Sequence, residues 1–431
     1  MIGFGAVAGF NWRGSASAAT TYDHLRVFAE VLKMIQDHYV EEKTTKELSE
    51  GAIRGLLRTL DPHSAYMDPE TFKSRKEETE GKFGGLGIEI TVRDSYVTIV
   101  APIDGTPAHR AGLQAGDKII NIDGTSAKNM NLMDAVKMMR GKIGADVSLT
   151  IFREEENREF NVTITRALIN IHSVKFGMLD DEVGYVHILS FNQNTSRETR
   201  RAVEKLRKNN LKGLVLDLRN NPGGLLEQAV EVSRMFLKKG HTVVTTRGRT
   251  GDQNMRKFTR SDGPYTDFPM IVLINAGSAS ASEIVAGAFQ DLKRAIVVGT
   301  TSFGKGSVQT IRQLGDGSGL SLTTARYYTP SGRMIHGTGI KPDINVKYRP
   351  PKKDDDDRMK PIREKELMER FNGSAAKKHN GKSDKSESRK KAPANEKRKV
   401  FDLELDNQLR RGLELIKAWE VFRDIKLKET G

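Results

Sequence analysis

The chain has no cysteine and few aromatic residues, which make up 6% of its 431 residues. The absence of cysteine excludes disulfides, thiolate nucleophiles and cysteine-based zinc sites, and it leaves the redox compartment open. The apolar stretch MIGFGAVAGF at 1–10 is too short to cross a bilayer, because a membrane-spanning helix needs about 20 apolar residues.

The N-terminal stretch instead has features of a secretory leader. Small residues at Ala16-Ser17-Ala18 give the A-x-A pattern of a signal-peptidase site, although a basic region before the apolar stretch is missing. We therefore expect residues 1–18 to be a signal peptide cleaved after Ala18. The mature protein is then expected to be periplasmic or otherwise secreted.

Charge is abundant and unevenly placed. The formal net charge is +14, and residues 351–400 hold 17 Lys and Arg against 10 Asp and Glu. No nucleic-acid motif accompanies this excess, so we expect no nucleic-acid partner. The tract at 349–399 has too little apolar content to pack, and we expect a disordered linker.

Helical apolar periodicity marks both ends of the mature chain. In the expected N-terminal helical region, 19–83, one stripe runs through Leu25, Phe28, Val31, Leu32 and Ile35. A final helix within 400–431 has an apolar face that must be buried on its own core or on a second subunit. A homodimer through the N- and C-terminal helices is one expectation, and peripheral membrane association is another.

The stretch 84–166 has short alternating strands separated by Gly and Asp turns, with a helix expected at 132–139. It resembles a PDZ domain. The peptide-binding loop would be Gly85, Leu86, Gly87 and Ile88, because converging backbone N–H groups suit a terminal carboxylate and the next strand can accept a peptide as an added strand.

Residues 167–348 alternate β-branched runs with amphipathic helices. The runs VGYVHILSF, KGLVLDLR, MIVLINA and AIVVGTT predict a largely parallel sheet. The fold class is therefore α/β and multidomain, in the order N-terminal helices, PDZ domain, α/β core of crotonase or Clp-like texture, and C-terminal helix.

The segment INAGSASASEIVAGAF at 274–289 predicts a strand, a tight turn of small residues and a helix starting near Ser280. Ser280 and Glu283 have the spacing of a capping box, which alone would account for both residues. The small neighbours would also leave the Ser280 hydroxyl open to a substrate, and a helix start supplies N–H donors for an oxyanion.

A serine nucleophile needs a base. No local pattern ties any of the nine histidines to Ser280, and G-x-S-x-G and H-E-x-x-H are absent. Lys305, in TTSFGKGSVQTI at 300–311, can serve if burial lowers its pKa toward neutrality. Gln309 lies four residues on, where it could hold the amine.

These motifs are similar to those of the carboxy-terminal processing, or tail-specific, serine proteases. The similarity rests on GSASASE, FGKGSVQ, DLRNNPGG at 217–224 and YYTPSGR at 327–333, and it runs from about residue 25 to 348. It implies a Ser–Lys endopeptidase with Ser280 as nucleophile, Lys305 as general base and Gln309 as its assistant. No metal or organic cofactor is implied.

The same resemblance implies further roles. Oxyanion donors would be Ala281 and either Gly223 or Gly224, which the sequence does not separate. Arg140, in MRGKIG at 139–144, matches an arginine that couples the PDZ domain to the active site. The substrates would be proteins or peptides with free, apolar C-termini.

Two other functions fit parts of the chain. A non-catalytic PDZ adaptor on an α/β domain explains residues 84–166. It does not explain why Ser280, Lys305 and Gln309 occur together. Residues 299–305 approach a P-loop, but Gly306 provides no hydroxyl for Mg²⁺ and the following residues predict a strand where a P-loop requires a helix.

Overall fold

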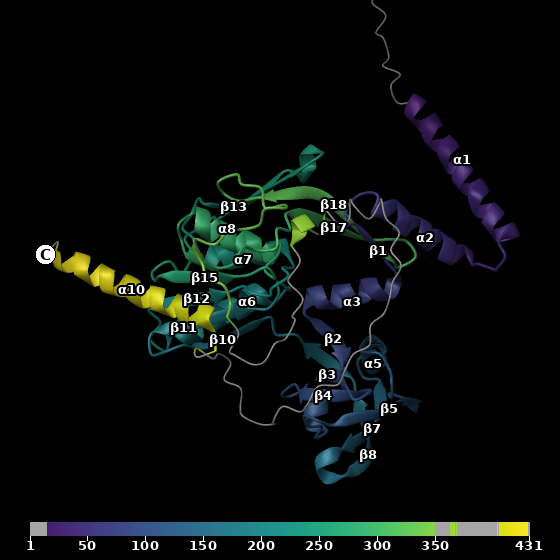
Figure 1. Ribbon diagram of the computed structural model, residues 1–431, viewed down its shortest axis with the longest axis horizontal. Helices are drawn as coiled ribbons and strands as arrows, with labels where there is room; N and C mark the ends of the chain where they lie inside the picture. The colour runs from purple at the N-terminus through teal and green to yellow at the C-terminus, as the bar shows by residue number, and fades with distance from the viewer. Residues whose placement is uncertain (1–14, 350–362, 367, 369–402, 404, 430–431) are drawn as a thin grey trace, which may run out of the picture.

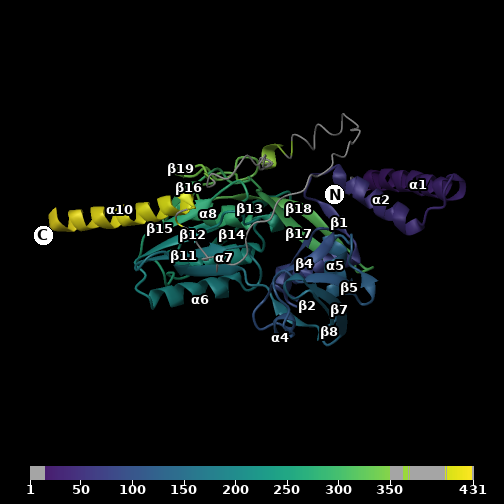
Figure 2. The ribbon, with the colours of Figure 1, turned by 60° about the horizontal axis from the view of Figure 1, so that its bottom comes forward.

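The computed structural model describes residues 15–349, 363–366, 368, 403 and 405–429 (Figure 1). It contains an N-terminal helical part, a small β domain, a larger α/β body and a long final helix. Figures 1 and 2 both show the first and last helices projecting from opposite sides of the body.

The N-terminal part follows the helical periodicity of the sequence. Thr44 and Glu47 form a capping box at the start of the second helix, and Asp68 caps the third. The apolar stripe of the first helix is largely uncovered, and Phe28 is 49% exposed. The elements are α1 (Ser15–His38), α2 (Thr45–Arg58), β1 (Ala65–Met67) and α3 (Pro69–Glu80).

The proposed leader lies partly outside the described residues, which begin at Ser15. Helix α1 includes Ala18. Cleavage after Ala18 therefore stays a prediction.

The small β domain has a sheet in the order β3-β4-β5-β7-β8, with β6 beside β5. Strands β2 and β9, which connect the domain to the rest of the chain, pair with each other, so its two connections run side by side. The elements are β2 (Lys82–Gly85), β3 (Ile88–Arg93), β4 (Tyr96–Pro102), α4 (Pro107–Arg110), β5 (Lys118–Ile122), β6 (Thr125–Ser126), α5 (Leu132–Met139), β7 (Asp146–Arg153), η1 (Glu154–Glu156), β8 (Arg158–Thr165) and β9 (Ala167–Asn170).

The body is built on a six-stranded sheet in the order β10-β11-β12-β15-β16-β19. All neighbours are parallel except β10, which is antiparallel to β11. The four β-branched runs thus form the parallel sheet that they predict. The strands are β10 (Val174–Met178), β11 (Val183–Ile188), β12 (Gly213–Asp217), β15 (Met270–Ile274), β16 (Ile296–Gly299) and β19 (Ile344–Asn345).

Both faces of this sheet are covered. Leu216 and Val272 pack with three helices on one face, while Val215 and Ile271 point to the other and pack against Ile416 of the final helix. This alternation explains why the strands are apolar throughout. The helices are α6 (Thr195–Arg207), α7 (Leu226–Phe236), α8 (Ala281–Asp291) and, on the second face, α10 (Asn407–Glu429).

A second sheet joins the N-terminal part to the body. Its order is β1-β18-β13-β14, with β17 on β18, and Tyr66 of β1 pairs with Leu320 of β18. This pairing places the loop before β1 beside β18, where the Ser64 hydroxyl accepts from the Thr323 N–H at 3.2 Å. The remaining elements are β13 (Thr242–Gly248), η2 (Gly251–Gln253), β14 (Met255–Phe258), β17 (Ser307–Gln313) and β18 (Gly319–Tyr328).

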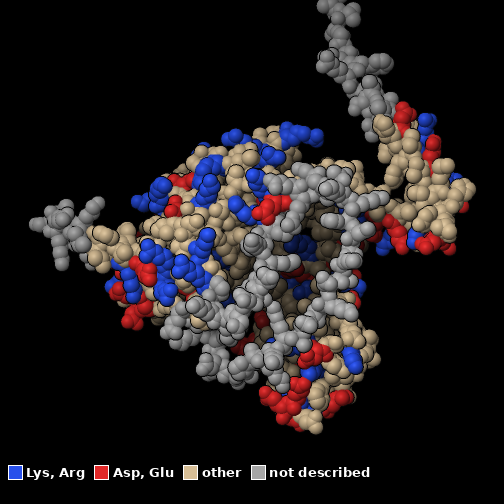
Figure 3. Space-filling model, in the orientation of Figure 1, with Lys and Arg blue, Asp and Glu red and all other residues tan. Residues whose placement is uncertain are grey.

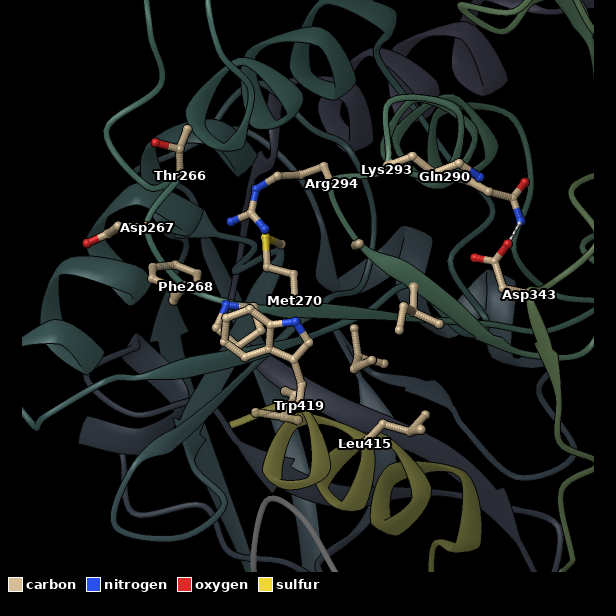
Figure 4. Close-up of a pocket in the computed structure, with 15 residues that line it drawn as sticks. Thr266, Asp267, Phe268, Met270, Gln290, Lys293, Arg294, Asp343, Leu415 and Trp419 are labelled. Carbon is tan, nitrogen blue, oxygen red and sulfur yellow. Dashed lines mark hydrogen bonds between the residues drawn. The ribbon is translucent and has the colours of Figure 1, made fainter. Parts of the chain in front are cut away.

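Helix α10 is only partly packed. Leu409 and Ile416 are buried on the sheet, whereas Phe422 is 70% exposed. A cavity of about 510 Å³ lies between α10 and the amino ends of β15 and β16, with Trp419 on one wall and Arg294 on the other (Figure 4). Among the described residues, no helix is both long and apolar enough to cross a membrane.

Candidate active site

Ser280 lies at the carboxyl edge of the parallel sheet, in the turn between β15 and α8. Its backbone has φ 54° and ψ −111°, a left-handed conformation that is costly for a residue with a side chain. The turn is fixed nearby by Ser278, whose hydroxyl donates to the Leu218 carbonyl at 2.7 Å and whose carbonyl accepts from the Phe303 N–H at 3.0 Å. Strain held in this way is common at functional sites.

Glu283 connects the two segments that carry the predicted nucleophile and base. Its Oε2 accepts the backbone N–H of Ser280 at 2.8 Å and that of Lys305 at 2.9 Å. Its Oε1 accepts the Gly304 N–H at 2.7 Å and the Ser302 hydroxyl at 2.5 Å. The structure therefore brings Ser280 and Lys305 to one carboxylate oxygen.

The role of Glu283 is wider than the capping box predicted for it. The residue is 0% exposed, and burial raises the pKa of its carboxyl group to about 7 against the effect of four donors. A solvent-exposed cap would need none of the contacts to Ser302, Gly304 or Lys305. The sequence does show a glutamate among small and apolar residues at the start of this helix. The capping box alone accounts for that glutamate, so the sequence does not reveal the extra contacts.

Lys305 lies in the loop between β16 and β17 and is partly buried. Burial lowers the pKa of its amine below the ordinary lysine value, while the carboxylate of Glu364 opposes this shift and the charge of Arg75 reinforces it. Within the described chain, no hydrogen bond joins the Ser280 hydroxyl to the Lys305 amine. Such contacts often tighten only when substrate binds.

Gln309 is the third residue of strand β17 (Ser307–Gln313). Its side-chain amide donates to the Thr323 hydroxyl at 2.8 Å and to the Ser307 hydroxyl at 3.3 Å, and its carbonyl oxygen accepts from Ser321. These bonds fix the side chain between β17 and β18. Its predicted contact with the Lys305 amine stays a prediction.

Strand β17, which begins two residues after Lys305, also bears on the P-loop alternative. A P-loop must open a helix, and residues 307–313 form a strand instead. The structure therefore excludes that alternative, as the sequence indicated.

The two glycines of the DLRNNPGG segment differ in their contacts. Gly223 has φ +98°, and a Cβ atom there would lie 2.8 Å from the Cβ of Ser280, so this position requires glycine. The Gly223 N–H donates to the side chain of Asn221 at 2.9 Å. The N–H of Gly224 has no hydrogen-bond partner among the residues that the structure places, and Gly224 is exposed.

Ala281 is the first residue of α8, so its N–H has no partner within the helix. It lies close to Gly223, because a Cβ on that glycine would be 2.9 Å from the Ala281 nitrogen. Gly223 and Ala281 thus lie next to Ser280, the predicted nucleophile.

The predicted peptide-binding loop, Gly85 to Ile88, joins β2 to β3. The Gly87 carbonyl accepts from the Ile103 N–H at 2.9 Å and the Thr106 hydroxyl at 3.0 Å. Gly87 has φ +79°, and a Cβ there would lie 2.4 Å from Thr106, so glycine is needed. Strand β3 is an edge strand of its sheet in the described structure, with α5 beside it.

Arg140 ends α5 and faces the N-terminal part. Its guanidinium lies 4.2 Å from the centroid of the Phe83 ring and 3.8 Å from the Glu77 carboxylate of α3. Lys137 of α5 also pairs with Glu70 of α3 at 2.7 Å. Arg140 therefore contacts α3, the helix that carries Arg75, and does not contact Ser280 or Lys305.

One stretch of the charged tract differs from the expected linker. Most of the tract lies outside the described residues, but 363–366 are placed and Glu364 is 0% exposed. Its backbone N–H donates to the Phe303 carbonyl at 3.0 Å, and its Oε1 lies 2.6 Å from the Nε2 of His63 and 3.8 Å from the Nδ1 of His336.

The tract is therefore not entirely unpacked, because Glu364 binds beside the loop that carries Lys305. Sequence reasoning missed this cluster of Glu364, His63 and His336. The tract has no apolar periodicity, and nothing in its composition indicated a docking point.

Three family models match different parts of the chain. The model described as peptidase family S41 matches residues 182–346, the PDZ domain model matches 84–164, and the model described as the activating protease CtpB N-terminal domain matches 9–71. The carboxy-terminal-processing protease of Bartonella bacilliformis is 47% identical over 338 residues, which cover 77% of each chain. The chain belongs to the carboxy-terminal processing protease family.

Other members of this family are also similar. The carboxy-terminal processing protease CtpA of Bacillus subtilis is 37% identical over 334 residues, covering 77% of this chain and 71% of the relative. The solved photosystem II D1 C-terminal processing protease is 30% identical with a TM-score of 0.44, covering 75% of this chain and 92% of that one. The family models and the curated relatives show that the chain is a serine peptidase with a PDZ domain. The mixed α/β fold class is confirmed.

Proposed function

We propose that this protease cleaves protein substrates near their C-termini with Ser280 as nucleophile and Lys305 as general base. The observation that carries the proposal is the shared bond to Glu283, whose Oε2 accepts the backbone N–H of both residues. Burial of the Lys305 amine supports it further, because the resulting lower pKa increases the fraction of neutral amine near neutral pH.

The chemistry needs no metal or organic cofactor. The neutral Lys305 amine takes the proton of the Ser280 hydroxyl as Oγ attacks the scissile carbonyl. The resulting ammonium gives its proton to the departing amine, which leaves an acyl-enzyme on Ser280. Water, deprotonated by Lys305, then attacks this ester and releases the second product. Gln309, fixed on β17, is proposed to orient the Lys305 amine.

The tetrahedral oxyanion requires N–H donors that are not already used. The N–H of Gly223 is bonded to Asn221, whereas Gly224 and Ala281 keep theirs available in the described structure. We therefore assign the oxyanion donors to Ala281 and Gly224. Gly223 is then needed for the close approach to Ser280.

The PDZ domain supplies the preference for C-termini in this proposal. Backbone N–H groups of the loop from Gly85 to Ile88 would bind the free carboxylate, and the open edge of β3 would pair with the substrate tail. An apolar C-terminal side chain would pack between β3 and α5, a region that we call the PDZ groove. Arg140 would couple occupancy of this groove to the active site through α3.

The location and assembly belong to the same proposal. A leader at 1–18 would direct the enzyme to the periplasm or outside the cell. The exposed apolar side chains of α1 and of the distal part of α10 support a homodimer, because isolated helices rarely leave such stripes in water. Peripheral association with a membrane surface is the alternative use of these stripes.

The test uses a peptide with a free apolar C-terminus and a fluorophore–quencher pair across the cleaved bond. Ser280→Ala should abolish turnover while changing the unfolding free energy by no more than about 0.5–2 kcal/mol, the cost of losing a cap. Ser282→Ala, which removes one hydrogen bond to the Asn221 carbonyl, should keep measurable turnover. An inactive Ser282→Ala beside an active Ser280→Ala would refute the assignment.

A further inference from the structure

A buried ionic network lies where β12 ends, on the opposite face of the sheet from α8. Arg219 is about 10% exposed and donates to both oxygens of Asp217, with the shortest contact at 2.6 Å. Tyr185 also donates to Asp217, at 2.8 Å. The guanidinium has further donors that point away from β12 toward the start of α10.

Asp406, just before α10, receives those donors. The Nη1 of Arg219 lies 3.0 Å from Oδ1 of Asp406, and Nη2 lies 2.7 Å from Oδ2. Gln408 accepts a third bond from Nη1 at 3.0 Å. This paired geometry is the strong and directional form of an arginine–carboxylate contact.

Asp406 also caps α10. Its Oδ1 accepts the N–H groups of Gln408 at 3.1 Å and Leu409 at 2.9 Å. The same carboxylate thus fixes both the start of the helix and the guanidinium of Arg219. Docking of α10 and the position of Arg219 are therefore linked through one side chain.

Arg219 leads directly into the loop that holds the glycines beside the nucleophile. Asn220 donates its N–H to the Asn275 side chain at 2.9 Å, and the Asn221 carbonyl accepts the N–H of Ala279 at 3.0 Å. The Ser282 hydroxyl donates to the same carbonyl at 3.0 Å. The loop at 218–224 and the turn that carries Ser280 are consequently one bonded unit.

We propose that Asp406 is a positioning residue for catalysis, acting through Arg219 to hold the 218–224 loop where it supplies an oxyanion donor to Ser280. The proposal rests on the function proposed above for Ser280 and Gly224. Asp406 lies beyond residue 346, where the match to the peptidase family model ends. In this proposal the C-terminal helix supports the position of an oxyanion donor, in addition to packing on the sheet.

The effect should fall on the transition state. A donor that moves away from the oxyanion stabilises the tetrahedral state less but leaves ground-state binding in the PDZ groove unchanged, so kcat falls while KM stays constant. A misplacement of about 1 Å can lower a rate by about a hundredfold.

Asp406→Asn is the informative variant. Asparagine caps helices as well as aspartate does, so α10 should keep its start. The amide removes the charge and turns one oxygen into a donor that faces Nη2 of Arg219. On the fluorogenic peptide we expect kcat to fall about tenfold or more at constant KM, measured well below the melting temperature of each variant.

Lys417→Met is the matched control. Lys417 pairs with Asp180 at 2.6 Å and so also attaches α10 to the body, but it has no contact with the 218–224 loop. Its kcat should equal that of the wild type. An unchanged kcat in Asp406→Asn would overturn the proposal, and so would an equal fall in Lys417→Met, since that would indicate general loosening of α10.

Gln408→Leu covers the case in which Asp406→Asn does not fold. It removes one acceptor from Arg219 and the side-chain hydrogen bond to the Val346 carbonyl, while Asp406 still caps α10. A smaller fall of kcat at constant KM is expected. A wild-type kcat in a folded Gln408→Leu would then reject the proposal. An active Ser280→Ala would instead reject the underlying function, so the two failures are distinguishable.

Discussion

At the scale of single residues, Lys305 combines burial with the need to carry a proton for part of each cycle. Burial lowers the pKa of its amine, so the folded protein binds this proton less tightly than the unfolded chain does. A lysine whose pKa is lowered on folding destabilises the protein by its full amount at any pH below the folded pKa. The destabilisation decreases above that pKa and disappears once the pH exceeds the pKa in the unfolded chain, about 10.4.

The first prediction therefore concerns both activity and stability. Lys305→Met should be inactive yet unfold at a higher urea concentration than the wild type at pH 7, because a buried charge is replaced by an apolar side chain of similar length. The difference should shrink as the pH approaches 10. Lys305→Arg should be inactive too, since guanidinium stays protonated. A Lys305→Met variant less stable than the wild type at pH 7 would contradict this account.

The second prediction concerns Glu364, which lies beside the Lys305 loop. Burial lowers the pKa of Lys305, and the charge of Arg75 lowers it further. The carboxylates of Glu364, Asp61 and Glu283 raise it. Removing the Glu364 charge should therefore lower the pKa of Lys305 further. In Glu364→Gln the rising limb of the pH profile of kcat/KM should move to lower pH.

Glu366→Gln is the control for this shift. Glu366 lies in the same short stretch and the substitution changes the net charge equally, but its side chain is exposed. Its pH profile should coincide with that of the wild type, because exposed charges are screened by solvent. Equal shifts in both variants, or a shift of Glu364→Gln to higher pH, would show that Glu364 does not act on Lys305.

At the scale of secondary-structure elements, the helix α3 contacts both the PDZ domain and strand β1 of the second sheet. Glu77 and Glu70 of α3 pair with Arg140 and Lys137 of α5. The same helix carries Arg75, whose charge lowers the pKa of Lys305. We therefore expect movement of the PDZ domain to change the electrostatic surroundings of Lys305 through α3.

The third prediction tests this coupling. A substrate with an amidated C-terminus should be cleaved slowly, because the PDZ loop lacks its carboxylate. If binding in the groove activates the enzyme, an added uncleavable peptide with a free apolar C-terminus should raise the initial rate on the amidated substrate, with a coupling of about 1–3 kcal/mol. Arg140→Ala should lose the stimulation and keep its basal rate. A flat or falling curve for the wild type would leave the PDZ domain as a docking site alone.

Much of the element pattern could be read from the sequence, and the reason is local. The helix at 132–139, the four buried strands and the turn before α8 each follow from periodicity and capping within a few residues. The pairing of Arg219 with Asp406 and of His63 with Glu364 could not be read in the same way. These are contacts between polar residues far apart in the chain, and neither leaves a periodic pattern.

At the scale of the whole molecule, basic side chains are spread over the protease body while acidic ones gather at the outer end of the PDZ domain (Figure 3). The acidic residues of this end include Glu154–Glu156, between β7 and β8. Exposed apolar side chains gather on α1 and on the distal part of α10. These two helices lie at opposite sides of the molecule.

The fourth prediction concerns assembly. If the stripe on α1 is a subunit interface, the protein should sediment as a dimer at micromolar concentration, and Leu25→Asp with Phe28→Asp should give a monomer. Both side chains are well exposed in the single chain, so the substitutions should leave the fold intact. Sedimentation of the wild type as a monomer would reject the homodimer.

The mechanism requires that Ser280 becomes acylated during turnover. The most direct measurement is rapid acid quenching of the enzyme with an excess of peptide, followed by digestion and mass spectrometry. A substrate-derived acyl group is expected on Ser280 alone, at a level that falls in Lys305→Met. An acyl group on Ser278 or Ser282, or steady turnover of an unmodified Ser280→Ala enzyme, would contradict it.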